Sequence, residues 1–213
     1  MASEIDICNL ALAHLGDTAT IASLSPPEGS AQAEHCARFY PVARDSLLEM
    51  HPWGFATKRV QLALLTSGWP EWTYAYAQPA DALNVIAILP PESTDDYSTG
   101  VPDSAGGSYV PQPFSCEIND SGAPVIYTDQ DDAVLRYSAT VTDPTRFSPL
   151  FVMALSWHLA SMLAGPIIKG DAGAAEAKRC AGMMQAYLSK AVESDSSQRR
   201  VRPEHVVGWM AGR

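Results

Sequence analysis

The sequence predicts an α+β protein: a helical bundle of two N-terminal and two C-terminal helices, an inserted antiparallel β lobe and an extended C-terminal arm. Apolar residues recur at helical spacing over residues 1–50 and again from about 148 to 194. The segment between them has short alternating apolar runs separated by turn residues, which is typical of strands. We therefore divide the chain into a helical domain over 1–56 and 145–195, an acidic β-rich lobe over 57–144, and an arm over 196–213.

The switch from helix to strand falls on the hexapeptide His-Pro-Trp-Gly-Phe-Ala at residues 51–56. Pro52 has no N–H and disfavours the α region for the residue before it, so a helix that reaches Met50 ends there. Trp53 and Phe55 lie two residues apart, which is the spacing of side chains on one face of a strand. We predict that both rings form a core where the helical domain meets the lobe, with ligand stacking by Trp53 as the alternative.

The predicted helices have recognisable ends. Ser3 with Asp6 approximates a capping box, and Ser30 is the N-cap of the second helix. The pair Gly165–Pro166 is expected to stop or break the third helix. The last helix is expected from about 172 to 194, followed by a polar linker over 195–198.

Six strands are predicted in the lobe, over 57–65, 72–76, 83–89, 114–118, 124–128 and 133–141. The turn sequence Asn-Asp-Ser-Gly at 119–122 predicts a hairpin between the fourth and the fifth. Short strands with such turns favour a small antiparallel sheet or barrel. Residues 90–112 contain four prolines and three glycines, and we expect an exposed loop whose length makes it a candidate functional element.

The charge of the chain is unevenly distributed. Between Gln61 and Pro144 there are twelve acidic residues and a single base, Arg136, which gives that segment a net charge of −11 within a chain of net charge −10. An acidic surface serves solubility, which is one interpretation. The other is a surface that must not bind polyanions.

No motif of a known catalytic chemistry is found. The sequence lacks a Walker loop, a G-x-G-x-x-G after a strand, an H-E-x-x-H, a nucleophile elbow and a zinc-spaced cluster. Asp129, Asp131 and Asp132 lack the glycine and glutamate of an EF-hand loop, so we interpret them as a solvated hairpin tip. His35 and Cys36 point about 100° apart on a helix and form no catalytic dyad. We expect no enzyme, no cofactor and no metal site.

The remaining titratable side chains are interpreted as structural. His14 is interpreted as a capping or surface residue, and His158 as a polar neighbour of the core. The four cysteines are scattered without a C-x-x-C, which favours reduced thiols in a protein made in the cytoplasm. No apolar run reaches the roughly 18 residues of a membrane span, and the first residues lack the basic region of a signal peptide.

The C-terminal arm differs in composition from the rest of the chain. Residues 199–213 contain four arginines together with Trp209 and Met210. Arg and Trp are the residue types that dominate interface hot spots. We interpret the segment as an arm that orders on a partner, with a disordered chain end as the alternative.

Several short motifs follow one another along the chain. They are I-C-N-L-A-L-x-x-L-G at 7–16, A-R-x-Y-x-x-A-R-D-x-L-L at 37–48, the hexapeptide at 51–56, Y-x-Y-x-x-P-x-D at 74–81, Arg136-Tyr137, F-x-x-A-L at 151–155 and Leu159-Ala160. With these motifs in this order, the chain resembles the head-to-tail adaptor family of short-tailed bacteriophages, the tail tubular protein A group, over roughly residues 4–194. The matching positions are packing residues, and the arm and the 90–112 loop lie outside them.

The resemblance implies a structural protein of the virion, located at the head–tail junction and made in the cytoplasm of the bacterial host. In this family a ring of identical subunits, usually a dodecamer, joins the portal to the tail tube or nozzle. DNA passes through the lumen without specific binding, and no membrane is involved. Helices form the ring wall and an inserted β domain faces the tail. Another phage neck or head-completion protein is the alternative, followed by a small-molecule or metal-dependent enzyme.

Two sets of residues are candidates for these roles. Acidic side chains in the lumen would repel phosphate, since each basic contact would add affinity for DNA and hold it back. The candidates for that role are Asp95, Asp96, Asp129, Asp131 and Asp132. The arm would bind the portal, as C-terminal tails do in relatives, and its candidates are Arg199, Arg200, Val201, Arg202, Val206, Val207, Trp209 and Met210.

Overall fold

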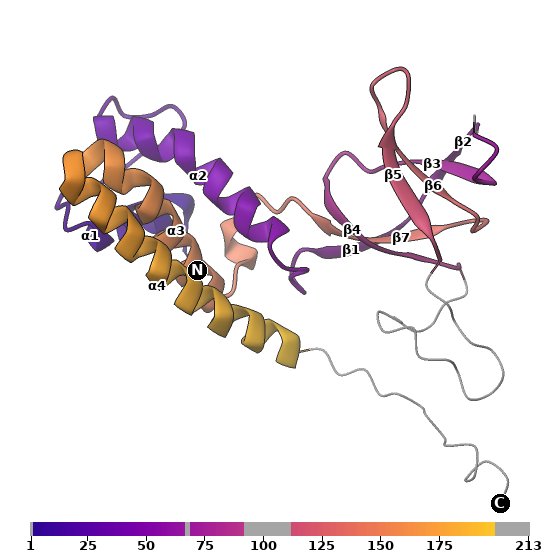
Figure 1. Ribbon diagram of the computed structural model, residues 1–213. Coiled ribbons are helices and arrows are strands. Elements are labelled where there is room, and N and C mark those ends of the chain that lie inside the picture. The colour runs from indigo at the N-terminus through magenta and orange to yellow at the C-terminus, as the bar shows by residue number, and fades with distance from the viewer. Residues whose placement is uncertain (1, 67–68, 92–111, 199–213) are drawn as a thin grey trace, which may run out of the picture. The chain divides into compact units, whose positions relative to one another are not determined.

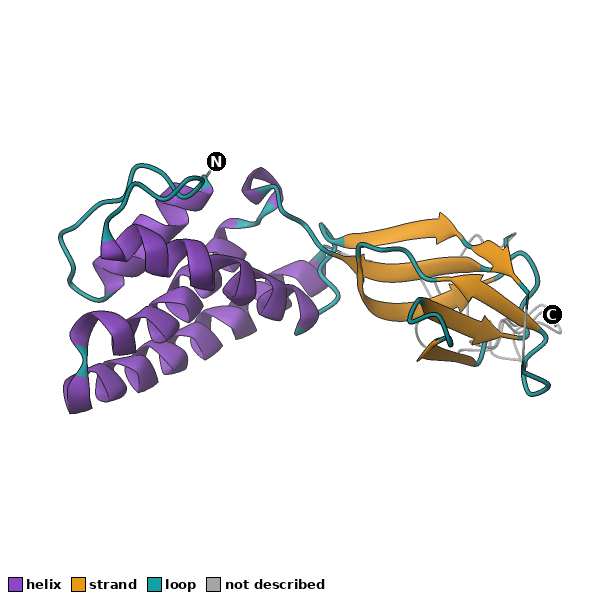
Figure 2. Cartoon of the chain, turned by 90° about the horizontal axis from the view of Figure 1, so that it is seen from above, coloured by secondary structure: helices purple, strands orange, loops and turns teal. Residues whose placement is uncertain are grey.

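The computed structural model describes residues 2–66, 69–91 and 112–198 (Figure 1). It confirms the α+β class, with helices and two antiparallel sheets. The chain divides into two compact units, Met1–Ala56 with Thr140–Gln198, and a unit that contains Thr57–Ala139. The described helices all belong to the first unit and the described strands to the second (Figure 2). Residues 140–144, which we predicted in the lobe, belong to the helical unit, because the last strand ends at Ala139.

The helical unit contains α1 (Glu4–His14), α2 (Ala31–Glu49), α3 (Pro149–Ile168) and α4 (Gly170–Ser197), with a short 3-10 helix, η1 (Pro144–Arg146), before α3. The predicted N-caps are confirmed. Ser3 and Asp6 form a reciprocal capping box, in which each backbone N–H donates to the other side chain. The Ser30 hydroxyl accepts from the Ala33 N–H at 3.2 Å. These caps fix where α1 and α2 begin.

The helix α3 is the core helix of this unit and packs against α1, α2 and α4. Nine of its side chains are buried. It is also the one helix among the described residues that is long and apolar enough to cross a membrane by composition, with a mean hydropathy of 1.6, although 44% of that window is buried inside the protein. We had expected no such segment. The packing on three helices accounts for the buried part of its apolar surface.

The prediction that Gly165–Pro166 ends α3 is wrong. The helix continues to Ile168, since a proline in the last turn removes only one backbone donor. The chain turns at Lys169, which has a positive φ of 62°, and α4 begins at the next residue. The two helices then pack closely at Gly173, where a Cβ would lie 3.0 Å from the Ala164 carbonyl oxygen. A side chain at this crossing would push the Ala164 carbonyl aside by a few tenths of an ångström, so the glycine favours the close packing of the two helices.

The lobe consists of two antiparallel sheets. The first has the strand order β1 (Thr57–Gln61), β7 (Val134–Ala139), β4 (Ala82–Leu89). The second has the order β2 (Ala63–Leu65), β3 (Tyr74–Ala77), β6 (Pro124–Thr128), β5 (Phe114–Ile118). Side chains from both sheets share one buried cluster, which includes Tyr76, Ile88, Ile126 and Leu135. The lobe is thus built as two layers around one core.

Two features of the lobe differ from the prediction. Residues 57–65 form two strands in different sheets, because Leu62 between them is buried and donates its N–H to the Ala133 carbonyl at 2.9 Å. Trp72 does not continue the alternation of Tyr74 and Tyr76. It lies before β3 and packs on the opposite face of the sheet, against Ala75, Val125 and Tyr127, while Tyr74 and Tyr76 pack in the shared core. The predicted hairpin of β5 and β6 is confirmed.

Candidate functional site

Trp53 and Phe55 belong to an aromatic cluster within the helical unit. Trp53 is fully buried, and its Nε1–H donates to the Leu47 carbonyl at 2.8 Å. Its ring lies 5.0 Å from that of Phe151 and 5.8 Å from that of Phe55. Residues 54–56 form a turn, so the strand spacing that we assumed for the two rings is wrong. The named partners of Trp53 all lie in the helical unit, which makes the ring a structural anchor of that unit.

The segment predicted as a polar linker belongs to α4. Asp195 lies in the last turns of that helix, and its carboxylate accepts from the Gly54 N–H at 3.0 Å and contacts His51 Nε2 at 3.3 Å. A carboxylate with a backbone donor and an imidazole is a favourable arrangement that a sequence pattern does not reveal. The helix therefore runs on to Ser197, and its end is tied to the turn that follows α2.

His14 lies in the last turn of α1, as a capping residue does, but its side chain is partly buried rather than fully on the surface. Its ring stacks on Trp157 with centroids 3.6 Å apart, and its Nε2 lies 3.1 Å from the Ser156 hydroxyl, which itself donates to Met153. The guanidinium of Arg179 lies over the other ring of the pair, 5.2 Å from the Trp157 centroid. Burial, and then the charge of Arg179, lower the pKa of His14. The stack joins α1, α3 and α4.

His158 is a polar neighbour of the core, as predicted. Its Nε2 lies 3.0 Å from the hydroxyl of Ser46, which donates to the Ala43 carbonyl, so the imidazole is the donor in this pair. Its Nδ1 is buried and has no hydrogen-bond partner among the described residues. A second ring proton would have no acceptor, and burial lowers the pKa of His158.

We expect the stability of the protein to fall as the pH decreases below about 6.5, the ordinary pKa of histidine. Both His14 and His158 have a lowered pKa in the folded state, so the unfolded chain binds more protons in that range. Above about pH 7 both states are neutral at these positions and the effect disappears. Urea unfolding from pH 5 to 7.5 measures it. The double variant His14→Gln, His158→Gln should show a flatter dependence, and an unchanged slope would contradict the assignment.

The lobe is acidic, as predicted, but its net charge within the observed bounds is smaller than the −11 counted over 61–144. The segment 57–139 contains eleven acidic residues and three bases, a net charge of −8, because β1 contributes Lys58 and Arg59 and Asp143 belongs to the helical unit. One of the acids is neutralised locally: the Asp81 carboxylate accepts from Lys58 Nζ at 2.6 Å and from the Tyr137 hydroxyl at 2.9 Å. Lys58, then the Tyr137 hydroxyl, lower the pKa of Asp81. Asp81 is therefore a structural carboxylate.

The candidate lumen residues have different surroundings. Asp129 accepts from the N–H and the hydroxyl of Thr73, both at 2.9 Å, and these bonds lower its pKa. Asp131 and Asp132 are exposed. They do not form a hairpin tip, since β6 and β7 belong to different sheets and the turn passes between the two layers. Asp95, Asp96 and the eight arm candidates lie outside the described residues.

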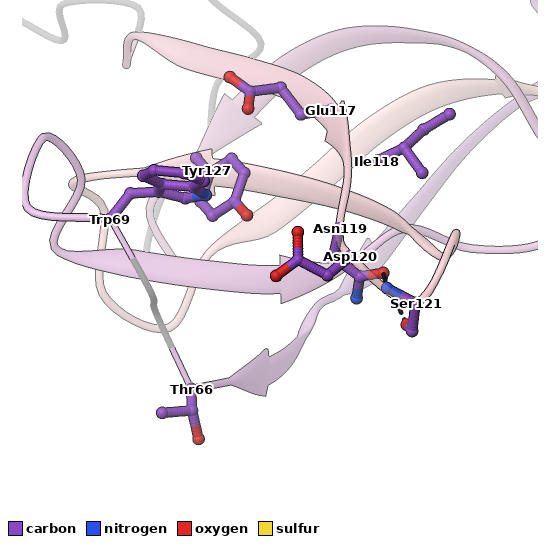
Figure 3. Close-up of a pocket in the computed structure, with 8 residues that line it drawn as sticks. All are labelled: Thr66, Trp69, Glu117, Ile118, Asn119, Asp120, Ser121 and Tyr127. Carbon is purple, nitrogen blue, oxygen red and sulfur yellow. Dashed lines mark hydrogen bonds between the residues drawn. The ribbon is translucent and has the colours of Figure 1, made fainter.

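A hollow on the outer face of the second sheet is the site that the sequence did not reveal. Two adjoining spaces of about 470 Å³ and 230 Å³ share Trp69 and Glu117 in their walls. Glu71 and Trp72 complete the smaller space. The larger one is lined by Thr66, Trp69, Glu117, Ile118, Asn119, Asp120, Ser121 and Tyr127 (Figure 3). Aromatic rings and carboxylates thus meet around one concave surface.

The turn between β5 and β6 shapes one wall of this hollow. The Asn119 side-chain oxygen accepts from the N–H of Ser121 at 3.1 Å, from its hydroxyl at 2.7 Å and from the Ala123 N–H at 2.9 Å. Gly122 takes a positive φ of 82°. With the turn held in this way, the Asp120 carboxylate points toward the rings of Trp69 and Tyr127 (Figure 3).

We find no other chemical centre in the part of the chain that the structure describes. No group of three or more His, Cys, Asp or Glu side chains is placed there to hold a metal ion. Cys36 is buried beside Cys8, and the hydrogen bond between the two thiols, followed by burial, raises the pKa of Cys8, while the same bond lowers the pKa of Cys36. His35 and Cys36 were interpreted as independent of one another, and nothing among the described contacts joins them.

Comparisons with known proteins add no assignment. No protein-family model matches this chain, and no curated protein matches it. The function therefore has to be argued from the architecture, the charge and the motifs of the chain itself.

Proposed function

We propose that this chain is a structural head-to-tail adaptor of a short-tailed bacteriophage, a subunit of a ring that joins the portal to the tail tube or nozzle. The observation that carries the proposal is the architecture. One helical unit is built from the two ends of the described chain, and an all-β lobe is inserted between α2 and α3. This is the arrangement that the motif resemblance implies. In it, the hexapeptide at 51–56 lies where the chain passes from α2 to the first strand of the lobe.

The negative charge of the lobe supports a protein that lets DNA pass without binding it. A net charge of −8 on the segment 57–139, repeated around a ring, would repel the phosphate backbone and let DNA pass. Asp131 and Asp132 are exposed acids that could take part in this repulsion. In this proposal the helical unit forms the ring wall and the lobe faces the tail.

We expect the isolated protein to bind duplex DNA poorly even at low salt. Gel shift of a short duplex at about 20 mM salt is the measurement, because non-specific binding is strongest when counterions are scarce. The control is a variant in which lysine replaces Glu117, Asp120, Asp131 and Asp132. It should bind the duplex and slow its migration in the gel. Tight binding by the native chain would favour a DNA-gripping role instead.

The attachment of the ring to the portal is assigned to the basic arm. Because α4 extends to Ser197, a truncation that leaves the helix intact should remove residues 199–213 rather than the 196–213 expected from the sequence. We expect this truncated chain to keep its helical circular dichroism and to lose co-sedimentation with the portal protein. A full-length variant with Arg199, Arg200 and Arg202 replaced by alanine separates charge from length. Undiminished portal binding by the truncated chain would reject the role of the arm.

A further inference from the structure

We propose that the hollow on the outer face of the second sheet is a receptor for an arginine side chain of a partner protein. The inference rests on the lining of the hollow and is independent of the adaptor function. Trp69, Trp72 and Tyr127 supply aromatic surface, and Glu71, Glu117 and Asp120 supply carboxylates. No basic residue is among the described lining residues.

The position of these groups follows from the strand register. Ser115 pairs with Tyr127, and Glu117 pairs with Val125, so these side chains share one face of the sheet with Ala75. That face is the one opposite the shared core. The segment before β3 brings Trp72 onto it, since Trp72 packs against the cluster of Ala75, Val125 and Tyr127. The floor of the hollow is therefore sheet, and the segment before β3 and the β5–β6 turn form its walls.

The carboxylates remain available for a ligand. Glu117 accepts one hydrogen bond, from the Ser115 hydroxyl at 2.8 Å, and forms no ion pair among the described residues. Glu71, Glu117 and Asp120 are all exposed side chains. Trp69 beside them is 55% exposed, which is high for an indole. A large exposed ring next to several carboxylates is typical of an interaction site.

The chemistry of the lining selects a planar cation. The face of an indole or phenol attracts a cation, and Arg is found there more often than Lys. A guanidinium also stacks flat on the ring and can donate two parallel hydrogen bonds to one carboxylate. A space of about 470 Å³ accommodates the end of one such side chain with part of its backbone. An arginine that inserts between the rings and the carboxylates would stack on the rings and donate hydrogen bonds to the carboxylates.

The test uses the full chain labelled with [15N]tryptophan and titrated with the peptide acetyl-Gly-Arg-Gly-amide. We expect saturable shifts of the Trp69 and Trp72 indole signals, while the buried Trp53 and Trp157 serve as internal references. The same peptide with citrulline, which keeps the shape and loses the charge, should produce no shift. A lysine peptide should bind more weakly than the arginine peptide.

Matched variants locate the site. The double variant Glu117→Gln, Asp120→Asn should weaken binding about fivefold or more. The variant Asp131→Asn, Asp132→Asn makes the same change of net charge in the same lobe and should leave the affinity within about twofold. Equal losses in both variants would show attraction by net charge alone and overturn the proposal. Equal shifts of the indole signals by the arginine and citrulline peptides would also overturn it. The same holds if maltotetraose or calcium shifts these signals and neither basic peptide does.

Discussion

Replacing Trp53 by alanine is expected to destabilise the helical unit by about 3–5 kcal/mol, the range for a buried aromatic side chain cut back to a methyl group. The ring is fully buried and is packed by Phe151, Phe55 and His51. Its Nε1–H also supplies a hydrogen bond to the Leu47 carbonyl, close to the end of α2. The variant would therefore lose packing and leave a buried carbonyl without its donor.

Denaturant unfolding followed by far-ultraviolet circular dichroism measures this loss. Trp53→Phe keeps one aromatic ring but loses the N–H donor and the volume of the second ring, so it should cost less than the alanine variant, about 1–3 kcal/mol. Trp69→Ala removes the same side chain from an exposed position and should change stability by less than about 1 kcal/mol. A Trp53→Ala variant as stable as the native chain would contradict the anchoring role of the hexapeptide.

Replacing Tyr76 by alanine is the corresponding change in the lobe, with an expected cost of about 3–5 kcal/mol. Tyr76 is 1% exposed and lies in the core shared by the two sheets. Its hydroxyl donates to the Gln130 carbonyl at 2.9 Å and accepts from the Ala133 N–H at 3.4 Å. Both partners lie in the turn that passes from β6 to β7, so this one side chain links the core to the crossing between layers.

Hydrogen exchange of the full chain distinguishes the two variants. Tyr76→Ala should accelerate exchange in peptides of the lobe and leave those of α1 to α4 protected, and Trp53→Ala should do the reverse. Tyr76→Phe keeps the ring and should reproduce only about 1–2 kcal/mol of the effect. Equal acceleration throughout the chain in both variants would mean that the two units unfold as one.

The periodic parts of the fold could be predicted from the sequence. Capping side chains lie next to the helix starts, as at Ser3 and Ser30, so their effect is local. The β5–β6 hairpin was predicted for the same reason, because the turn residues specify it. Pro166 shows the limit of such rules. It was predicted to stop or break α3, but the helix continues to Ile168, since a proline in the last turn removes only one backbone donor.

Long-range contacts account for what could not be predicted. The alternation in residues 57–65 does not show that Leu62 is where the chain changes sheets, since its partner Ala133 is 71 positions away. His14 was predicted to be a capping or surface residue, and its stacking on Trp157 could not be foreseen because Trp157 lies on another helix. The hollow was missed for the same reason. Its rings and carboxylates come from segments on either side of the 92–111 stretch, and only the strand register brings them together.

The most direct test of the adaptor proposal is a negative-stain electron micrograph of this protein mixed with the portal protein of the same phage. The proposal predicts ring-shaped particles in which this chain extends the portal along its axis, with a central channel wide enough for DNA. Class averages of the mixture should show the same symmetry for both layers. Portal rings without added density, beside separate monomers or dimers of this chain, would contradict the proposal.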